Sequence, residues 1–363
     1  MSAYRTEVLR GAGGIIRARA MLREFAAACG QQEAISDIHY YLDKPGLLSR
    51  TPVLVVLRRS MDGAEQVAAA VLLFQYKIAG IPLGVYTSND RSGRRTVISQ
   101  PEDRVTMATQ AAKYLFDRGA NCVMLSLRSD GLAPESTPAH ASGDVSWIFR
   151  QREIPDYLPL RTTYDETLAH IGKRTRTHMR YYRRRAEDLL HCSFHPELTI
   201  DEDELLSFNH QCMYPVSDQV AAWRLRALQY FERPILMGLR DGDGRLLSVL
   251  GGRRLGVESD LLWQMNHRDL EGQSLSLAMR TYFIEHEISQ QARRVYLDGG
   301  SSHSLCHSFA RGTITDFAVI RRTPLSFLVR KIARSLIPVD NDLGRLLTEE
   351  VNTPVGEPVL RTN

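Results

Sequence analysis

Two spacings of hydrophobic positions recur along the chain, and in its first half they predict helices alternating with antiparallel strands. Residues 15–29 and 102–118 place apolar side chains every three to four positions, which predicts helices, the second of them capped by Gly119. Continuous apolar runs at 52–58 and 67–75 flank a polar stretch and predict a strand pair. We therefore expect a sheet with helices packed on it.

The second half repeats this order of elements without repeating the residues. The Asp241–Gly244 turn separates two predicted strands, and further strands and one helix are predicted at 261–266, 274–289, 295–298 and 316–321. A tandem motif with a period of about 20–50 residues is missing from the sequence, which excludes a solenoid. The predicted fold class is α/β (α+β), with two domains that each contain a mixed, mostly antiparallel sheet flanked by helices.

A basic segment lies between the two halves, at 160–190. Thr163 and Glu166 have the spacing of a capping box, which predicts one helix starting near Thr163. Its largely apolar stripe consists of Leu168, Ile171, Thr175, Met179, Tyr182, Ala186 and Leu189, and its cations are Lys173, Arg174, Arg176, Arg180, Arg183, Arg184 and Arg185. So much like charge in one helix favours an anionic partner. A solvated face that is partly neutralised by Glu187 and Asp188 is the alternative.

Composition and charge narrow the function classes. The chain has 363 residues, enough for two cores, and a net charge of only +4, so its basic character is local and not that of a general nucleic-acid binder. The five cysteines form no CxxC pair, and the histidines form no HExxH motif, so no metal site is expected. No signal peptide and no apolar run of about 18 residues is evident, so we expect a cytoplasmic protein.

A predicted strand, a glycine-containing loop and a predicted helix follow one another at 263–276. Free N–H groups and the helix dipole make such a unit a cradle for phosphate. At this point the chain resembles the GNAT acyltransferase superfamily, whose acyl-CoA pyrophosphate sits on an Arg/Gln-x-x-Gly-x-Gly/Ala loop. This chain has Arg268-Asp-Leu-Glu-Gly272-Gln-Ser274, which is one residue longer and ends on serine.

The resemblance becomes more specific with the basic segment, because an extended stretch ending at Leu160, a capped helix and the arginine-rich run 174–185 precede this loop. This order is similar to that of CelD-like (BioF2-like) acetyltransferases, tandem-GNAT relatives of the FemAB aminoacyl transferases. The resemblance covers most of residues 5–325. It implies an N-terminal GNAT-like domain, a basic junction helix, a C-terminal GNAT acyltransferase domain and a basic amphipathic helix with a polar tail, at 1–160, 161–192, 193–325 and 326–363.

The resemblance also implies the chemistry. Acyl-CoA, in particular acetyl-CoA, would be the donor, and the acceptor would be the amine or hydroxyl of a sugar, an amino acid or a peptide, in exopolysaccharide or cellulose biosynthesis. The residues expected to hold the donor are Arg268, Gly272, Gln273 and Ser274. The residues expected to bind substrate or other anions are Arg176, Arg180, Arg183 and Arg184. Asp298, His303 and Asn266 are the candidates for catalysis, whereas the Tyr-Lys pair usual in this family is replaced here by His303-Ser-Leu-Cys-His307.

Three alternatives stay open from the sequence. An aminoacyl-tRNA-dependent transferase of the FemAB type would use the basic helix on the RNA backbone, although no specific nucleic-acid partner is expected. A non-catalytic scaffold or binding protein with the GNAT fold would need no chemistry. The basic amphipathic segment 324–336 either packs on the second domain or lies on an anionic membrane surface, which would make the protein peripheral to the inner membrane.

Overall fold

In the computed structural model of the protein, the chain divides into two compact units. The structure describes residues 4–32, 34, 38–43, 45, 49–61, 64–88, 94, 97–128, 145–297, 304–321, 323–324, 328 and 331. Unit 1 contains 1–38, 46–154 and 312–363, and unit 2 contains 39–45 and 155–311. The predicted membrane-surface segment 324–336 falls almost entirely outside the described residues, as does the polar tail. In the described part of the chain, no helix is long and apolar enough to cross a bilayer.

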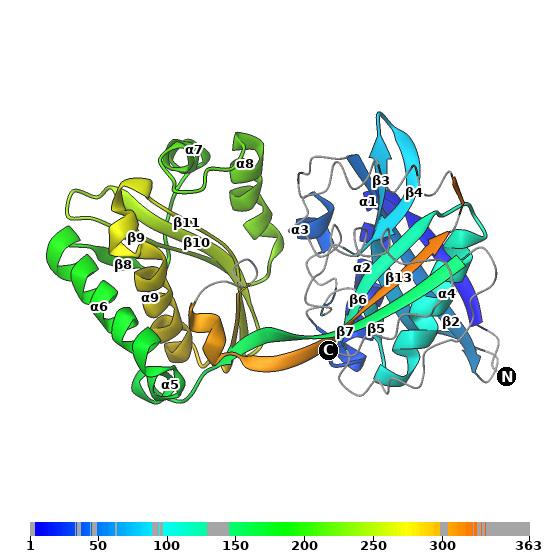
Figure 1. Ribbon diagram of the computed structural model, residues 1–363, viewed down its shortest axis with the longest axis horizontal. Helices are drawn as coiled ribbons and strands as arrows, with labels where there is room; N and C mark the ends of the chain where they lie inside the picture. The colour runs from blue at the N-terminus through cyan, green and yellow to red at the C-terminus, as the bar shows by residue number, and fades with distance from the viewer. Residues whose placement is uncertain are drawn as a thin grey trace. The chain divides into compact units, whose positions relative to one another are not determined.

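Unit 1 is a mixed sheet covered by helices (Figure 1). Its strands are β1 (Tyr4–Arg10), β2 (Ser49–Met61), β3 (Ala64–Ile78), β4 (Ile81–Thr87), β5 (Val97–Ser99), β6 (Cys122–Arg128) and most of β7 (Val145–Pro159) and β13 (Ala310–Arg321). Its helices are α1 (Gly11–Arg17), α2 (Arg19–Ala28), η1 (Pro101–Asp103) and α4 (Arg104–Phe116). The strands follow the order β1-β2-β3-β4-β6-β13-β7, with β5 beside β3, and only β4 and β6 run parallel among the pairs with a described register.

The core of unit 1 forms where α4 lies on β2, β3 and β6. Met107, Ala108, Ala111 and Leu115 of α4 are fully or almost fully buried. Alanine at these positions lets the helix approach the sheet closely, and the positive φ of Gly119, at 86°, ends the helical segment as the sequence predicts. The single helix predicted over 15–29 is two helices, because the chain breaks at Ala18.

Unit 2 carries the candidate site and has helices on both faces of its sheet (Figure 1). Its strands follow the order β7-β12-β11-β10-β9-β8, where β7 contributes its last residues and the others are β8 (Ser193–His195), β9 (Pro234–Arg240), β10 (Leu246–Leu255), β11 (Glu258–Asn266) and β12 (Arg294–Leu297). One face packs on α5 (Tyr164–His170), α6 (Lys173–Leu190), α9 (Leu275–Ser289) and η5 (Ser304–Ser308). The other packs on α7 (Glu202–His210), α8 (Asp218–Arg226) and η3 (Ala227–Tyr230), together with Tyr40 of α3 (Ile38–Leu42).

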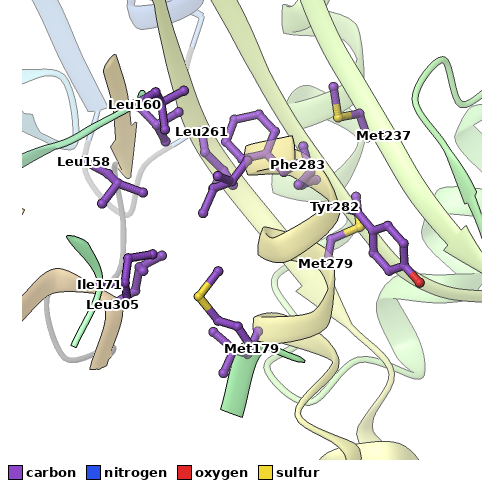
Figure 2. Close-up of a cluster of buried hydrophobic side chains, with 14 of the residues drawn as sticks. Leu158, Leu160, Ile171, Met179, Met237, Leu261, Met279, Tyr282, Phe283 and Leu305 are labelled. Atoms are coloured by element: carbon purple, nitrogen blue, oxygen red, sulfur yellow. The ribbon is translucent and has the colours of Figure 1, made fainter. Parts of the chain in front are cut away.

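The first of these two cores joins α6 and α9 to the sheet. Figure 2 shows Met179 of α6 together with Met279, Tyr282 and Phe283 of α9, and all four side chains are buried. Leucines from β7, β11 and η5 complete the same cluster. The predicted fold class is therefore confirmed, since each unit is a mixed, mostly antiparallel sheet flanked by helices.

The basic segment differs from its prediction in two respects. The capping box is present, because Glu166 N–H donates to Thr163 Oγ1 and Glu166 accepts from the Thr163 N–H. However, the predicted single helix is two helices, α5 and α6, which are separated by Ile171 and Gly172. Leu189, assigned to the apolar stripe, is 57% exposed. Gly172 starts α6 without a side-chain cap, so the loss of regular helix at this point is consistent with its low helix propensity.

Two glycines allow β10 and β11 to pair across a bulge. The register shifts between Gly251 and Gly252, so Leu262 has no Cα partner on β10 and the strand bends. A Cβ atom at Gly252 would lie 2.1 Å from the backbone oxygen of Asp260. Because this neighbour is backbone, it cannot rotate away, and only glycine fits.

We expect Gly252→Ala to lower the free energy of unfolding by about 1–3 kcal/mol, the usual cost of forcing extra volume into a packed site. The matched control is Gly242→Ala, whose Cβ would lie 3.5 Å from the nearest atom, His191 Cβ, an ordinary contact. Urea unfolding followed by circular dichroism measures both. Equal midpoints for the two variants would contradict this account of the bulge.

Candidate functional site

The end of β11 and the start of α9 form a strand–loop–helix unit that leaves backbone donors available. The chain passes from Asn266 through η4 (Arg268–Gln273) to Ser274, which adopts a left-handed conformation with φ 44° and ψ 51°. The side chain of the N-cap residue Ser274 makes no capping hydrogen bond among the described residues, and the first turn of α9 contains no acidic residue. The positive end of a 15-residue helix is therefore not neutralised by its own side chains, which favours an anion at this end.

Gly272 gives this loop an open surface. A Cβ atom built on Gly272 would meet no atom within 4 Å, so the fold itself does not require glycine here. Gly272 is exposed, while Gln273 and Ser274 are half-buried. The exposed Arg268 starts the same loop, and its backbone N–H donates to Gln211 O at 2.9 Å.

Helix α6 reaches this loop through Arg185. The Arg185 Nε donates to Gln273 Oε1 at 2.7 Å, and the same guanidinium donates through Nη1 to Tyr181 Oη at 2.7 Å. A cation is thereby held beside the start of α9. Arg185 is not among the four arginines that the sequence singled out, because the helical pattern alone does not tell which cation faces the loop.

The four selected arginines of α6 have different surroundings. Arg183 donates to Glu187 at 3.0 Å and to Glu285 at 2.6 Å, and it stacks over the Tyr282 ring. Burial by itself lowers the Arg183 pKa, and the hydrogen bonds to the two carboxylates outweigh it, so the pKa is raised overall. These contacts hold α6 on α9.

The remaining three are less deeply engaged. Arg176 donates to the backbone oxygens of Leu168 and Ala169 at 3.3 and 3.4 Å, and so satisfies carbonyls at the end of α5. Arg180 lies 3.4 Å from Asp165 in an exposed pair. Arg184 is exposed on the same helix. Of the four, Arg180 and Arg184 are the cations best placed to meet an anion from solvent.

Asn266 has a fixed amide orientation at the end of β11. Its Oδ1 accepts from Ser248 Oγ at 2.8 Å and from Gln264 Nε2 at 3.0 Å. Both donors occupy the oxygen, so the network assigns Nδ2 as the free end of the amide. Within the described residues, no acceptor is bonded to Asn266 Nδ2. A neutral amide does not take up a proton near pH 7, so Asn266 is suited to donate a hydrogen bond and not to act as a base.

His267, the residue after Asn266, is structural. It is 1% exposed, its Nε2 lies 3.1 Å from Gln211 Oε1 and in contact with Arg245, and its backbone bridges Cys212. These contacts tie the segment after α7 to the end of β11. Asp298 and His303, the other catalytic candidates, lie outside the described residues.

Comparisons with known proteins give likenesses of structure only. No protein-family model matches the chain, and no curated protein matches it. Similar solved structures include L-PGS from Bacillus licheniformis, at 12% identity and TM-score 0.49, over 87% of this chain and 96% of that chain. FemX is similar at 10% identity and TM-score 0.44, over 74% of this chain and 87% of that chain. A GCN5-related N-acetyltransferase from Sphaerobacter thermophilus is similar at 11% identity and TM-score 0.40, over 88% and 96% of the two chains. Likenesses at these values carry no activity over to this chain.

We expect Arg183→Gln to lower the free energy of unfolding by about 1–3 kcal/mol, since Glu187 and Glu285 lose a shared, partly buried cation. Arg184→Gln, one position along and exposed, is the control and should change it by less than about 0.5 kcal/mol. Urea unfolding followed by tryptophan fluorescence measures both variants. A stable Arg183→Gln protein would show that this ion-pair group does not hold α6 on α9.

Proposed function

We propose that the protein is an acyltransferase that uses acyl-CoA and binds it in unit 2. The observation that carries the proposal is the β11–η4–α9 unit, in which Arg185 lies beside the start of a helix whose first turn has no acidic residue and whose N-cap Ser274 makes no described side-chain capping bond. The GNAT-like loop at 268–274 supports it from the sequence. The CoA pyrophosphate would accept hydrogen bonds from the backbone around Gly272, Gln273 and Ser274, with the charge of Arg185 close by.

The rest of the donor would extend along the end of β11. Among the described residues, which end at Leu297 on this side, parallel pairing with β12 covers Glu258–Leu261 of β11, whereas β11 continues to Asn266. Strand backbone beyond Leu261 is thus not used by this pairing. Acyl-CoA supplies an activated thioester, and the free Nδ2 of Asn266 would donate to the oxygen that becomes negatively charged during attack. The acceptor ammonium needs a base, for which Asp298, directly after β12, stays our candidate.

The finer assignment rests on the sequence resemblance alone. A CelD-like acetyltransferase would use acetyl-CoA and act on a sugar, an amino acid or a peptide amine in exopolysaccharide or cellulose production. The scaffold alternative predicts no thioester turnover. Release of free CoA thiol from acetyl-CoA, measured with candidate acceptors, separates the enzyme from the scaffold.

Titration calorimetry with acetyl-CoA tests the donor site. We expect micromolar binding to the wild type and a loss of at least about tenfold with Gly272→Asp, because the new carboxylate repels the pyrophosphate. The control Gly272→Asn has the same shape without the charge and should keep most of the affinity. A Cβ atom at position 272 meets no atom within 4 Å, so both variants fit the loop. A carboxylate near the start of α9 also stabilises the protein without ligand, so a loss of affinity in Gly272→Asp would not reflect unfolding. Absence of binding to the wild type would reject the proposal.

A transferase that uses aminoacyl-tRNA is the second candidate, and the exposed cations of α6 favour it. Lys173, Arg174, Arg180 and Arg184 are all exposed, and the first two lie at the helix N-terminus, where positive charge is unfavourable without an anionic partner. Binding of tRNA that weakens steeply with salt, and less steeply in Arg184→Gln, would support this candidate. Saturable CoA binding without affinity for RNA would oppose it.

A further inference from the structure

Arg280 of α9 is a buried cation whose hydrogen-bond partner among the described residues is the neutral side chain of Gln264. It is 8% exposed, and its Nε donates to Gln264 Oε1 at 3.1 Å. Its Nη1 is buried and has no hydrogen-bond partner among the described residues. The pKa of Arg280 is lowered, first by burial, and the neighbouring Cys306 opposes this shift. Arginine nevertheless stays charged near neutral pH, so the guanidinium is a charged group without a counter-ion in the described part of the chain.

Two arginines of β10, in the sheet on which α9 packs, are paired with carboxylates. Arg253 is 2% exposed and lies 2.7 Å from Asp260, which is itself buried. Arg254 lies 2.7 Å from Glu287, a fully buried carboxylate. Unit 2 thus supplies carboxylates to two neighbouring guanidinium groups. Among the described residues, Arg280 of α9 thus differs from these two arginines in having no carboxylate partner.

The position of Arg280 connects it to the end of β11. Gln264, its partner, donates from Nε2 to Asn266 Oδ1 at 3.0 Å and to the backbone oxygen of Ser276 at 3.3 Å. Ser248 also donates to Asn266. These four residues, Ser248, Gln264, Asn266 and Arg280, are called the polar row below. Gln264 and Asn266 belong to the part of β11 that continues past its described pairing with β12, which is where the proposed acyl donor would lie; Ser248 pairs with Asn266 from β10, and Arg280 contacts Gln264 from α9.

The chemistry of the polar row selects an anion. Its side chains are three neutral groups and one cation, and two donors, Asn266 Nδ2 and Arg280 Nη1, have no acceptor among the described residues. A buried cation without a counter-ion is costly, and an external anion would remove that cost. The guanidinium fork fits a planar carboxylate, whose two oxygens accept from parallel N–H groups.

We infer that Arg280 binds a carboxylate of the substrate, within the polar row at the end of β11. The inference rests on the proposed function for the identity of the site. The carboxylate has two possible sources in the reaction: the transferred acyl group, if the donor is the CoA thioester of a dicarboxylic acid, or the acceptor, if it is an amino acid. Arg280 is thus a specificity residue that distinguishes charged from uncharged substrates.

The first experiment needs no CoA and compares wild type with Arg280→Met, which keeps an unbranched stem but removes the charged guanidinium. In thermal unfolding, sodium succinate should raise the Tm of the wild type above its value in sodium chloride of equal ionic strength, and this difference should vanish in Arg280→Met. Without ligand, Arg280→Met should have a Tm about 2–4 °C higher, because an unmatched buried charge is removed. A lower Tm for Arg280→Met, with no succinate effect on the wild type, would overturn the inference.

The second experiment locates the carboxylate by calorimetry and thiol release. If it belongs to the acyl group, wild type should bind succinyl-CoA at least about tenfold more tightly than acetyl-CoA, and Arg280→Met should bind both equally. If it belongs to the acceptor, thiol release from acetyl-CoA should be faster with glycine than with glycinamide, and Arg280→Met should lose this preference. Arg280→Lys, which keeps the charge but not the fork, should recover part of either preference.

The outcomes separate the two proposals. Acetyl-CoA binding that is equal in wild type and Arg280→Met, with no preference for a carboxylate on either substrate, would overturn the role of Arg280 and leave the donor site standing. Absence of CoA binding, together with a succinate-dependent Tm that requires Arg280, would reject the acyl-CoA donor and retain the carboxylate site.

Discussion

The packing of α6 against α9 is the interaction on which the site in unit 2 depends. Met179 on one helix and Phe283 on the other are both fully buried, and the Arg183 guanidinium bridges Glu187 of its own helix and Glu285 of α9. Tyr282 adds a hydrogen bond to Glu187 at 2.7 Å. Because this seam sets the position of α6 along α9, it also brings Arg185 to the loop that precedes α9.

The charges along α6 are distributed in a way that destabilises the helix itself. Cations at its N-terminus oppose the helix dipole, and the acidic residues Glu187 and Asp188 come near its C-terminus, where cations would be favourable. Two of the cations offset part of this unfavourable dipole interaction, because Arg183 pairs with Glu187 and Arg176 donates to the Leu168 oxygen. The exposed Lys173, Arg174, Arg180 and Arg184 make no comparable contribution, and their retention is best understood if an anion binds near this helix.

The buried arginines of unit 2 have two kinds of surroundings: some are paired with a carboxylate, and Arg280 contacts a neutral side chain. The Arg253–Asp260 and Arg254–Glu287 pairs place a carboxylate beside each guanidinium and connect neighbouring strands or a strand and α9. Such pairs are costly to break, because removing one partner leaves the other uncompensated. Arg280 lacks a carboxylate among the described residues, yet lies next to the free end of β11. A buried cation without a described carboxylate partner, beside the part of β11 that continues past its described pairing with β12, is an arrangement suited to a ligand.

Local sequence patterns determined much of this protein. Hydrophobic spacing predicted most strands and α9. The predicted Asp241–Gly244 turn is formed, with hydrogen bonds to Asp241 Oδ1, and the predicted capping box starts α5. These features could be predicted because each depends on residues only a few positions apart. The break at Gly172 and the roles of Arg185 and Arg280 did not follow from the sequence. Whether one of these cations meets a carboxylate or a neutral group depends on residues of other elements. Arg185 contacts Gln273, which is 88 positions away along the chain, and Arg280 contacts Gln264 on β11. Only the tertiary structure decides such matches, since they are set by the packing of α6 and α9 on the sheet.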